Sequence, residues 1–310
     1  TRKKLLMMGQ SLIGGMRLGM KQRNMPLWLN TSLKELIVEN GRVAGVIAER
    51  DGQTVTLRAR RAVILAAGGF EHNAEMRRQY QRQPITTEWT VGSEGNTGDA
   101  IQAGMRAGAA IDLMDEAWWG PTTLPPGRAP AFHVGERSHP GIIMVNQRGE
   151  RFTNEAASYV QVVQEMYRHH TADNAHVPCH FVFDQRFRDN YLFADLPPRQ
   201  PVPGRYLKNG YIRRADTLDE LAAQLSVPAA NLKATIARYN DFARSGKDAD
   251  FHRGDSAYDR YYGDPTVKPN PTMAPIEKPP FYGVKVVAGD LGTKGGLMID
   301  EYARVKRADG

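Results

Sequence analysis

The chain has 310 residues and a formal net charge of +7, from 41 lysines and arginines against 34 aspartates and glutamates. A chain of this length can bury a substantial core and is expected to form two domains. It has no run of about 18 apolar residues, so no membrane-spanning helix is expected. The basic residues are scattered without interleaved aromatic residues, so no nucleic-acid partner is expected.

The single cysteine, Cys179, excludes an internal disulfide framework and a metal site built from several cysteines. It lies in an apolar, strand-like run, which favours a core position over a nucleophile. The histidines lack acidic residues at metal-ligand spacing, so no metal is predicted. This cysteine usage makes a reducing, cytoplasmic location the default, with peripheral attachment to a membrane left open.

A helix and a group of strands are expected first. Apolar residues at helical spacing predict a helix over residues 3–23 with one buried stripe. The members of that stripe are Leu5, Met8, Leu12, Met16 and Met20. Strands are expected over residues 32–38, 42–49 and 54–57. Asn40-Gly41 and Asp51-Gly52 predict tight turns between them.

Residues 58–70, with the sequence RARRAVILAAGGF, are the most informative stretch. A short apolar run that ends in glycines is typical of a strand buried on both faces of a parallel sheet. Small residues at its carboxyl end allow a large ligand to approach the backbone. Ligands of open α/β sheets lie at that end, so the segment predicts the edge of a nucleotide site. The GxGxxG fingerprint for a pyrophosphate is absent from the sequence.

A glycine-rich loop follows a helix whose expected cap is Asn73. The loop holds Gly92, Gly95 and Gly98 and leads into a helix expected over residues 100–108. Backbone N–H groups of such a loop point outward. They suit a phosphate, a ribitol hydroxyl or the edge of a flavin ring.

The character of the chain changes between about residues 118 and 279, where proline-rich loops separate amphipathic helices. Thr217 and Glu220 form a capping-box signature, and Pro228 opens a second helix. We interpret Arg148, Glu150 and Arg151 as a structural, salt-bridged surface turn. A strand over residues 281–287 and a glycine cluster over residues 289–296 follow, so the middle region reads as an inserted α+β domain.

Five segments in this order resemble the flavoproteins of the fumarate reductase and succinate dehydrogenase superfamily. They are RVAGVIAE, AVILAAGGF, GNTGDAI, GIIMVNQRGERFTNE and GDLGTKGGLMID. Within that superfamily, FEHN at residues 70–73 and SAYDRYYGDP at residues 256–265 resemble the 3-ketosteroid Δ1-dehydrogenase family. The resemblance implies α/β plus α+β architecture: a partial Rossmann-like FAD-binding domain (residues 1–117 and 280–310) with an inserted mixed α+β substrate, or capping, domain (residues 118–279).

The resemblance also implies a reaction. Flavin N5 takes a hydride from C1 of a 3-ketosteroid while a tyrosine base removes a proton from C2, and the family motif maps that base onto Tyr159. A tyrosine with a pKa of about 10 is a poor base unless a neighbour assists it. The residues alone favour a hydrogen-bonded core or interface tyrosine at position 159, and it is the resemblance that favours a catalytic role. Ser158 stands where dicarboxylate reductases carry an arginine, which argues against fumarate or succinate.

Further site residues are implied by the same motifs. The residues expected beside the adenosine of FAD are Ala66, Ala67, Gly68, Gly69 and Phe70. Those expected at the ribitol and flavin are Asn96, Thr97, Gly98 and Asp99, and those near the isoalloxazine are Gly292, Lys294, Gly295 and Gly296. An apolar surface for the steroid is expected from Trp118, Trp119, Phe132 and Met144, for each of which core packing is the alternative.

Because the pyrophosphate fingerprint is missing, we expect this chain to be a fragment of a flavoenzyme that retains FAD weakly or not at all. The expected partners are a steroid and an electron acceptor of unknown identity, and the oligomeric state is open. Two alternatives are kept. One is a related flavin-dependent dehydrogenase or reductase acting on another enone or ketosteroid. The other is a non-catalytic folded module.

Overall fold

The computed structural model describes residues 5–309, without the side chain of Met8, and divides into two compact units between Leu65 and Ala66. The start of the expected first helix lies outside the described residues. The elements of the first unit are α1 (Met8–Gln22), β1 (Thr31–Glu39), β2 (Arg42–Arg50) and β3 (Gln53–Arg58). The three strands form one antiparallel sheet in the order β1-β2-β3.

Both hairpin turns of this sheet form where the sequence predicts them. Asn40 and Gly41 have φ values of 51° and 73°, and Asp51 and Gly52 have 51° and 81°. Two successive residues in the left-handed region twist a two-residue turn to match its strands, and asparagine, aspartate and glycine tolerate that region best. The predicted strands are therefore confirmed to within a residue or two at their ends.

The buried stripe expected along α1 is wrong for the residues that can be assessed. Leu12 and Met16 expose 59% and 57% of their surface, and Leu5 exposes more. Apolar spacing creates a stripe, but a stripe is buried only when another element packs on it.

The buried strand expected from the apolar run at residues 62–65, within residues 58–70, is also wrong. These residues form no strand, and the side chain of Ile64 is 89% exposed. A strand in a parallel sheet takes its hydrogen bonds from strands on both sides. Within residues 5–309 no segment pairs with residues 62–67, so the apolar run has no strand partner.

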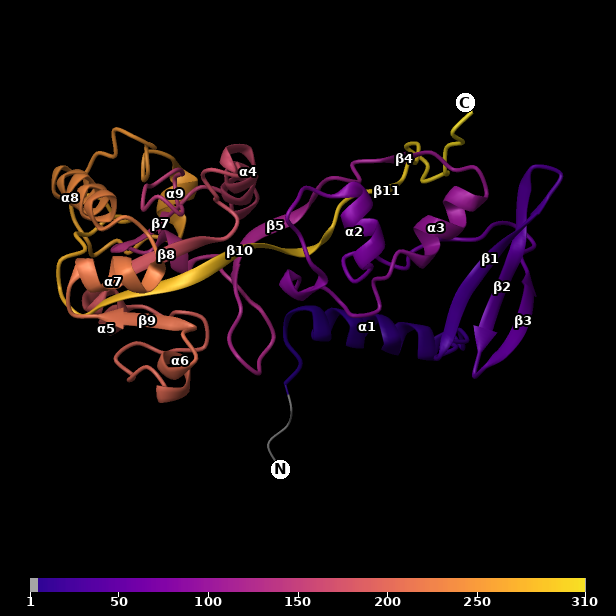
Figure 1. Ribbon diagram of the computed structural model, residues 1–310. Helices are drawn as coiled ribbons and strands as arrows, with labels where there is room; N and C mark the ends of the chain where they lie inside the picture. The colour runs from indigo at the N-terminus through magenta and orange to yellow at the C-terminus, as the bar shows by residue number, and fades with distance from the viewer. Residues whose placement is uncertain (1–4, 310) are drawn as a thin grey trace. The chain divides into compact units, whose positions relative to one another are not determined.

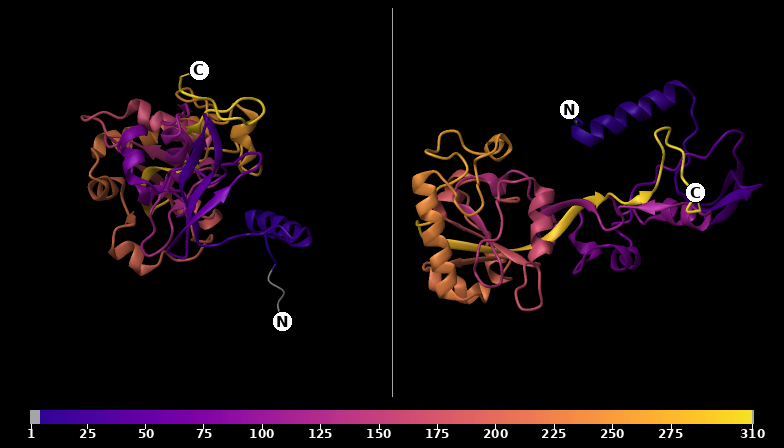
Figure 2. Two further views of the ribbon diagram at one scale, coloured as in Figure 1. Left: turned by 90° about the vertical axis from the view of Figure 1, so that its right-hand side faces the viewer. Right: turned by 90° about the horizontal axis from the view of Figure 1, so that it is seen from above.

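The second unit is built on a six-stranded antiparallel sheet. Its strands are β5 (Ala117–Thr123), β6 (Ala131–Phe132), β7 (Ile142–Val145), β8 (Cys179–Asp184), β9 (Ile212–Ala215) and β10 (Phe281–Thr293). The order is β6-β5-β10-β8-β7, with β9 on the free edge of β10. The first half of β10 pairs with β8 and β9 and the second half with β5, as its long yellow course in Figures 1 and 2 shows.

Where β7, β8 and the first half of β10 pair, both faces of the sheet are buried, each against its own helices. Alternating residues of β7 belong to different cores: Ile142 and Met144 to one, Ile143 and Val145 to the other. The first core includes the buried face of α4 (Tyr159–His169). The second includes apolar residues of α7 (Leu218–Leu225) and α8 (Ala229–Ser245). The period-two alternation of a strand sorts side chains to the two faces.

Helix starts follow the predicted caps. The side chain of Thr217 accepts from the Glu220 backbone N–H, which completes the predicted capping box of α7. The Asn73 side chain caps α2 (Ala74–Tyr80), and Gly98 precedes α3 (Asp99–Arg106). The remaining elements are η1 (Thr87–Trp89), β4 (Ile111–Asp112), η2 (Glu136–Ser138), α5 (Gln185–Asn190), α6 (Gly204–Lys208), α9 (Ala257–Tyr261) and β11 (Gly296–Leu297).

Buried polar side chains also hold the loops. Arg188 of α5 is buried, and its guanidinium donates to four backbone oxygens. Those oxygens belong to Tyr191, Leu196, Pro197 and Gln200. Cys179 lies fully buried in β8, where burial raises the pKa of its thiol, as expected of an unreactive core cysteine.

Candidate functional site

Three of the predicted cofactor segments meet at one buried carboxylate. Asn96 Nδ2 donates to Glu71 Oε1 at 2.5 Å, and the Thr293 backbone N–H donates to Glu71 Oε2 at 3.3 Å. The Thr293 hydroxyl in turn accepts from the Phe70 N–H at 3.0 Å. Gly98 N–H donates to the Gly69 carbonyl at 3.0 Å. We call residues 68–71, 92–98 and 290–293 the Glu71 cluster.

Glycines allow the segments of the Glu71 cluster to approach closely. A Cβ added at Gly69 or Gly92 would run into the Glu71 carboxylate, and one at Gly68 would run into the Asn96 amide. Gly98 has a φ of 79°, and a Cβ there would meet Met76 Sδ at 2.6 Å. Any larger residue at these positions would force the segments apart.

A buried ion pair contacts the Glu71 cluster. Arg77 Nη2 lies 2.6 Å from Asp290 Oδ2, and both side chains are fully buried or nearly so. Arg77 also donates to the Glu71 carbonyl, and the Thr90 hydroxyl donates to Asp290 Oδ1 at 2.6 Å. Removing one member of such a pair would leave an uncompensated buried charge.

The predicted adenosine segment has the surface that a nucleotide needs. Ala66, Ala67 and Gly68 are exposed, and Phe70 is fully buried beneath them. The described chain offers no acceptor to the backbone N–H groups of residues 66–69. Small exposed residues with free backbone donors fit an anionic or polar ligand, so these residues fit FAD.

The next predicted residues lie along β10 and β5. Thr293 pairs with Ala117 of β5, and the Lys294 N–H donates to the Glu116 carbonyl at 3.0 Å. The Lys294 ammonium lies 4.8 Å from the ring centroid of Trp118, which is 51% exposed. The glycine cluster and the exposed tryptophan are therefore neighbours on adjacent strands.

Tyr159 lies against an apolar side chain of the same sheet. Its ring meets Phe132 edge-on, with the ring centroids 5.4 Å apart. The Phe132 ring lies where a Cβ of Gly120 would be, so it rests directly on β5. Alternation along β5 puts Gly120 and Trp118 on one face. Trp118 and the Phe132 ring thus lie on one face of β5, and Tyr159 meets it through Phe132; we call these three partly exposed residues the β5 face.

Trp119 and Met144 occupy different positions from these three. Both are fully buried members of the first core. Trp119 packs edge-on against Tyr167, and its Nε1–H donates to Glu116. The Met144 backbone N–H donates to Glu155 Oε1 at 3.1 Å. Their positions match the alternative of core packing, and a substrate contact by either remains a prediction.

A buried network fixes the chain just before Tyr159. Arg137 donates to the carbonyls of Glu155 and Ala157, and Arg253 Nη1 lies 3.0 Å from Glu155 Oε2. Arg253 also donates to the backbone oxygens of Ile142, Arg137 and His139. Burial alone would raise the pKa of Glu155, but Arg151 and Arg253 hold it below its usual value. Burial lowers the pKa of Arg137 to about 10.

Arg151 corrects one expectation. The sequence predicts that it lies on a salt-bridged surface turn. In the structure its side chain is almost fully buried and pairs with Glu155 and Asp248 at 2.8 and 2.9 Å. The role is structural as expected, but the position is internal. Among residues 5–309, no group of three histidine, cysteine or acidic side chains could hold a metal ion, and no helix is long and apolar enough to cross a membrane.

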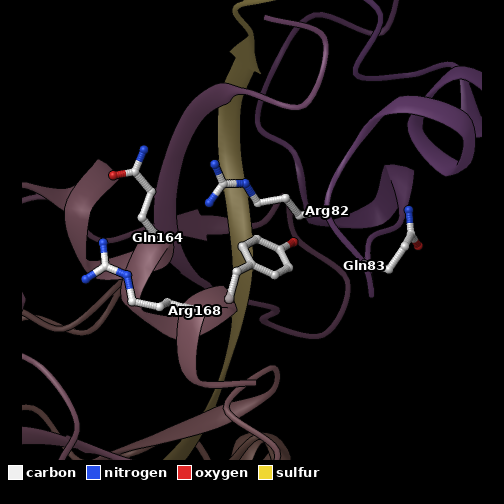
Figure 3. Close-up of a pocket in the computed structure, with 5 residues that line it drawn as sticks. Arg82, Gln83, Gln164 and Arg168 are labelled. Atoms are coloured by element: carbon white, nitrogen blue, oxygen red, sulfur yellow. The ribbon is translucent and has the colours of Figure 1, made fainter. Parts of the chain in front are cut away.

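Two pockets lie near α4. One of about 450 Å³ is lined by Arg82, Gln83, Gln164, Tyr167 and Arg168 (Figure 3). Its cations are paired: Arg82 with Glu116 and Arg168 with Glu165. Tyr167 lies eight residues beyond Tyr159, about 12 Å along the helix axis, so this pocket is separate from the β5 face. The other, of about 340 Å³, includes Ser158 and Gln161.

The fold and these segments define a flavin-binding class of protein. The family model described as FAD binding domain matches residues 1–310, and the chain belongs to this family. It is 51% identical over 319 residues to the 3-oxosteroid 1-dehydrogenase of Mycobacterium tuberculosis, with 100% of this chain and 56% of that protein covered. The chain thus spans little more than half the length of this relative.

Two solved structures share the fold. A 3-ketosteroid Δ1-dehydrogenase from Sterolibacterium denitrificans, in complex with 1,4-androstadiene-3,17-dione, matches with a TM-score of 0.94 and 45% identity over 97% of this chain and 55% of that one. The open conformation of a flavocytochrome c3 fumarate reductase matches with a TM-score of 0.60 and 23% identity over 97% of this chain and 48% of that one. The expected α/β plus α+β fold class is confirmed.

Sequence reasoning missed Glu71, Arg77 and Asp290, which hold the predicted cofactor segments together. Glu71 appeared only as one letter of a motif. Its signal was a carboxylate directly after a small-residue run, in a position where burial requires several donors. The partners that supply those donors are 25 and 222 residues away, and no local pattern marks them.

Proposed function

We propose that this chain carries the substrate face and half of the FAD site of an enzyme that dehydrogenates a 3-ketosteroid between C1 and C2. The observation that carries the proposal is the pairing of β5 with β10. It sets the β5 face, with Trp118, Phe132 and Tyr159, beside the segment that leads into the Glu71 cluster. The similarity to 3-oxosteroid 1-dehydrogenases supports the same substrate class.

We assign the cofactor side to the predicted segments. Residues 66–70 would lie beside the adenosine, Asn96 to Asp99 beside the ribitol and flavin, and residues 292–296 beside the isoalloxazine. The fingerprint for the pyrophosphate is absent from this sequence, and the N–H groups of residues 66–69 lack partners in the described chain. In domain terms, residues 1–117 and 280–310 belong to the FAD side and residues 118–279 to the substrate side.

The chemistry on the substrate divides between two atoms. Bound FAD supplies the acceptor for the hydride that leaves C1. Tyr159 removes the proton from C2, and the electron pair of that C–H bond forms the C1–C2 double bond conjugated with the C3 ketone. Phe132 orients the Tyr159 ring by its edge contact, and Trp118 and Phe132 offer apolar area that excludes water from the steroid.

The test is Tyr159→Phe in a protein that contains this chain together with the remaining length of its relatives. We expect turnover of a 3-keto-4-ene steroid with an artificial electron acceptor to fall by about 10²-fold or more, while flavin absorbance after desalting is unchanged. Tyr261→Phe is the matched control, because Tyr261 is 77% exposed and its ring meets that of Tyr262 edge-on.

Near-normal turnover by Tyr159→Phe would remove the base assignment. Turnover of fumarate in place of the steroid would overturn the substrate class. The 310-residue chain alone is expected to lose FAD on desalting, since its pyrophosphate cradle is absent from the sequence. A yellow chain with a flavin spectrum after that step contradicts this expectation.

A further inference from the structure

Glu71 joins three chain segments through a carboxylate that solvent does not reach. Each oxygen holds a different segment: Oε1 accepts from Asn96 of the glycine loop, and Oε2 accepts from the backbone and hydroxyl of Thr293 on β10. All these partners are donors, as an ionised carboxylate requires. A carboxylate with two acceptor oxygens is thus the bridging group between segments that are remote in sequence.

The fit around this carboxylate is tight on three sides. The positions of a Cβ at Gly69, Gly92 and Gly292 all fall against Glu71 oxygens, the last at 3.3 Å. One glycine comes from each segment of the Glu71 cluster. The carboxylate therefore sets how far apart the segments lie, and the glycines allow that distance to be short.

We propose that Glu71 is a positioning residue for the cofactor. Its carboxylate fixes the spacing between residues 68–71, 92–98 and 290–293 and does not touch FAD itself, because the side chain is enclosed by the three segments. The inference rests on the proposed function, which places FAD against these segments. It adds a residue that acts through Asn96 and Thr293.

An exchange of the amide and carboxylate groups tests this role. Asn96→Asp sets a second carboxylate against Glu71, and like charges at hydrogen-bond distance repel. We expect FAD to dissociate at least tenfold more readily from that variant, in a protein of the relatives' full length. Adding Glu71→Gln restores one amide and one carboxylate, so the double variant should recover most of the FAD affinity that Asn96→Asp loses.

The single variant Glu71→Gln should bind FAD more weakly than wild type but more tightly than Asn96→Asp, because it replaces one acceptor oxygen by a donor without adding a second charge. The Asn96 amide can turn over and present its oxygen to the new amide. Glu75→Gln is the control, because Glu75 is exposed on α2 and removes the same charge nearby. If the double variant binds FAD as weakly as Asn96→Asp, or if Asn96→Asp binds as wild type does, the inference is wrong.

A second readout separates this inference from the proposed function. Amide hydrogen exchange of residues 92–98 is measured by mass spectrometry in the 310-residue chain without cofactor. Exchange should rise in Asn96→Asp and return to the wild-type rate when Glu71→Gln is added. If the wild-type protein binds no FAD, the proposed function fails, and the exchange pattern still decides whether Glu71 holds the segments together.

Discussion

His180 illustrates how a single residue links burial to the pH dependence of stability. It lies in β8 with 7% of its surface exposed, and its Nδ1 has no hydrogen-bond partner among residues 5–309. Lys285 of β10 is its cross-strand neighbour. Desolvation, and then the charge of Lys285, lower the pKa of His180 to about 4. The folded chain therefore holds this imidazole neutral at a pH where the unfolded chain protonates it.

We predict that the free energy of unfolding falls as the pH drops from about 6.5 to about 4. In that window the unfolded state binds more protons at residue 180, so stability rises with pH and is lost towards acid, by about 3 kcal/mol at most. His180→Gln should flatten this slope in urea unfolding at several pH values. His252→Gln, at an exposed site, should leave it unchanged. A slope that persists in His180→Gln contradicts the assignment.

At the scale of an element, β5 separates two roles by its alternation. Trp119 points into the core and Trp118 remains half exposed, although the two are neighbours in sequence. Because Gly120 has no side chain, the Phe132 ring packs directly on the backbone of β5. The edge contact between Phe132 and Tyr159 then links the strand to the start of α4.

Gly120→Ala should displace the Phe132 ring. A new Cβ would overlap ring atoms, so we expect a loss of about 1–3 kcal/mol in the free energy of unfolding and a higher KM for a steroid in the complete enzyme. Urea unfolding and steady-state kinetics measure the two effects. Gly204→Ala is the control, because its Cβ would meet nothing within 4 Å at the first residue of α6. Equal stability of both variants would show that the ring has room to move.

For the second unit as a whole, β10 is the central strand. It lies between β5 and β8, and most of its residues are buried. Its partners come from residues 117–123, 179–184 and 212–215, all earlier in the chain. The sheet is therefore completed only when the chain beyond residue 280 is present.

A chain that ends at residue 279 should fail to fold its second unit. Without β10, the apolar strands β5 and β8 keep open edges, which favour aggregation over a cooperative native state. Residues 66–309 without the first unit are the control and should fold, because they form a compact unit of their own. Near-ultraviolet circular dichroism and urea titration distinguish the two. A cooperative transition in the chain ending at residue 279 would contradict the prediction.

Turns and helix caps could be predicted from the sequence because they depend on neighbouring residues. Asn40-Gly41 and the capping box at Thr217 act within a few residues, so their signals are complete in the sequence. The apolar run at residues 62–65 predicts a strand that does not form, because a strand depends on partners elsewhere in the chain. Glu71 escaped notice for the same reason, since its partner Thr293 is 222 residues away. The sequence motifs predict the cofactor segments, and only the fold shows that these segments meet at one carboxylate.

The buried arginines have a consequence for how this protein tolerates variation. Arg188 and Arg253 hold loops by donating hydrogen bonds to main-chain carbonyls, which every amino acid carries. Substitutions of the side chains in those loops therefore leave these hydrogen bonds intact. The arginines themselves are not replaceable by lysine, whose single ammonium cannot span carbonyls that a planar fork reaches together. Related sequences should therefore differ more often in these loops than at Arg188 and Arg253.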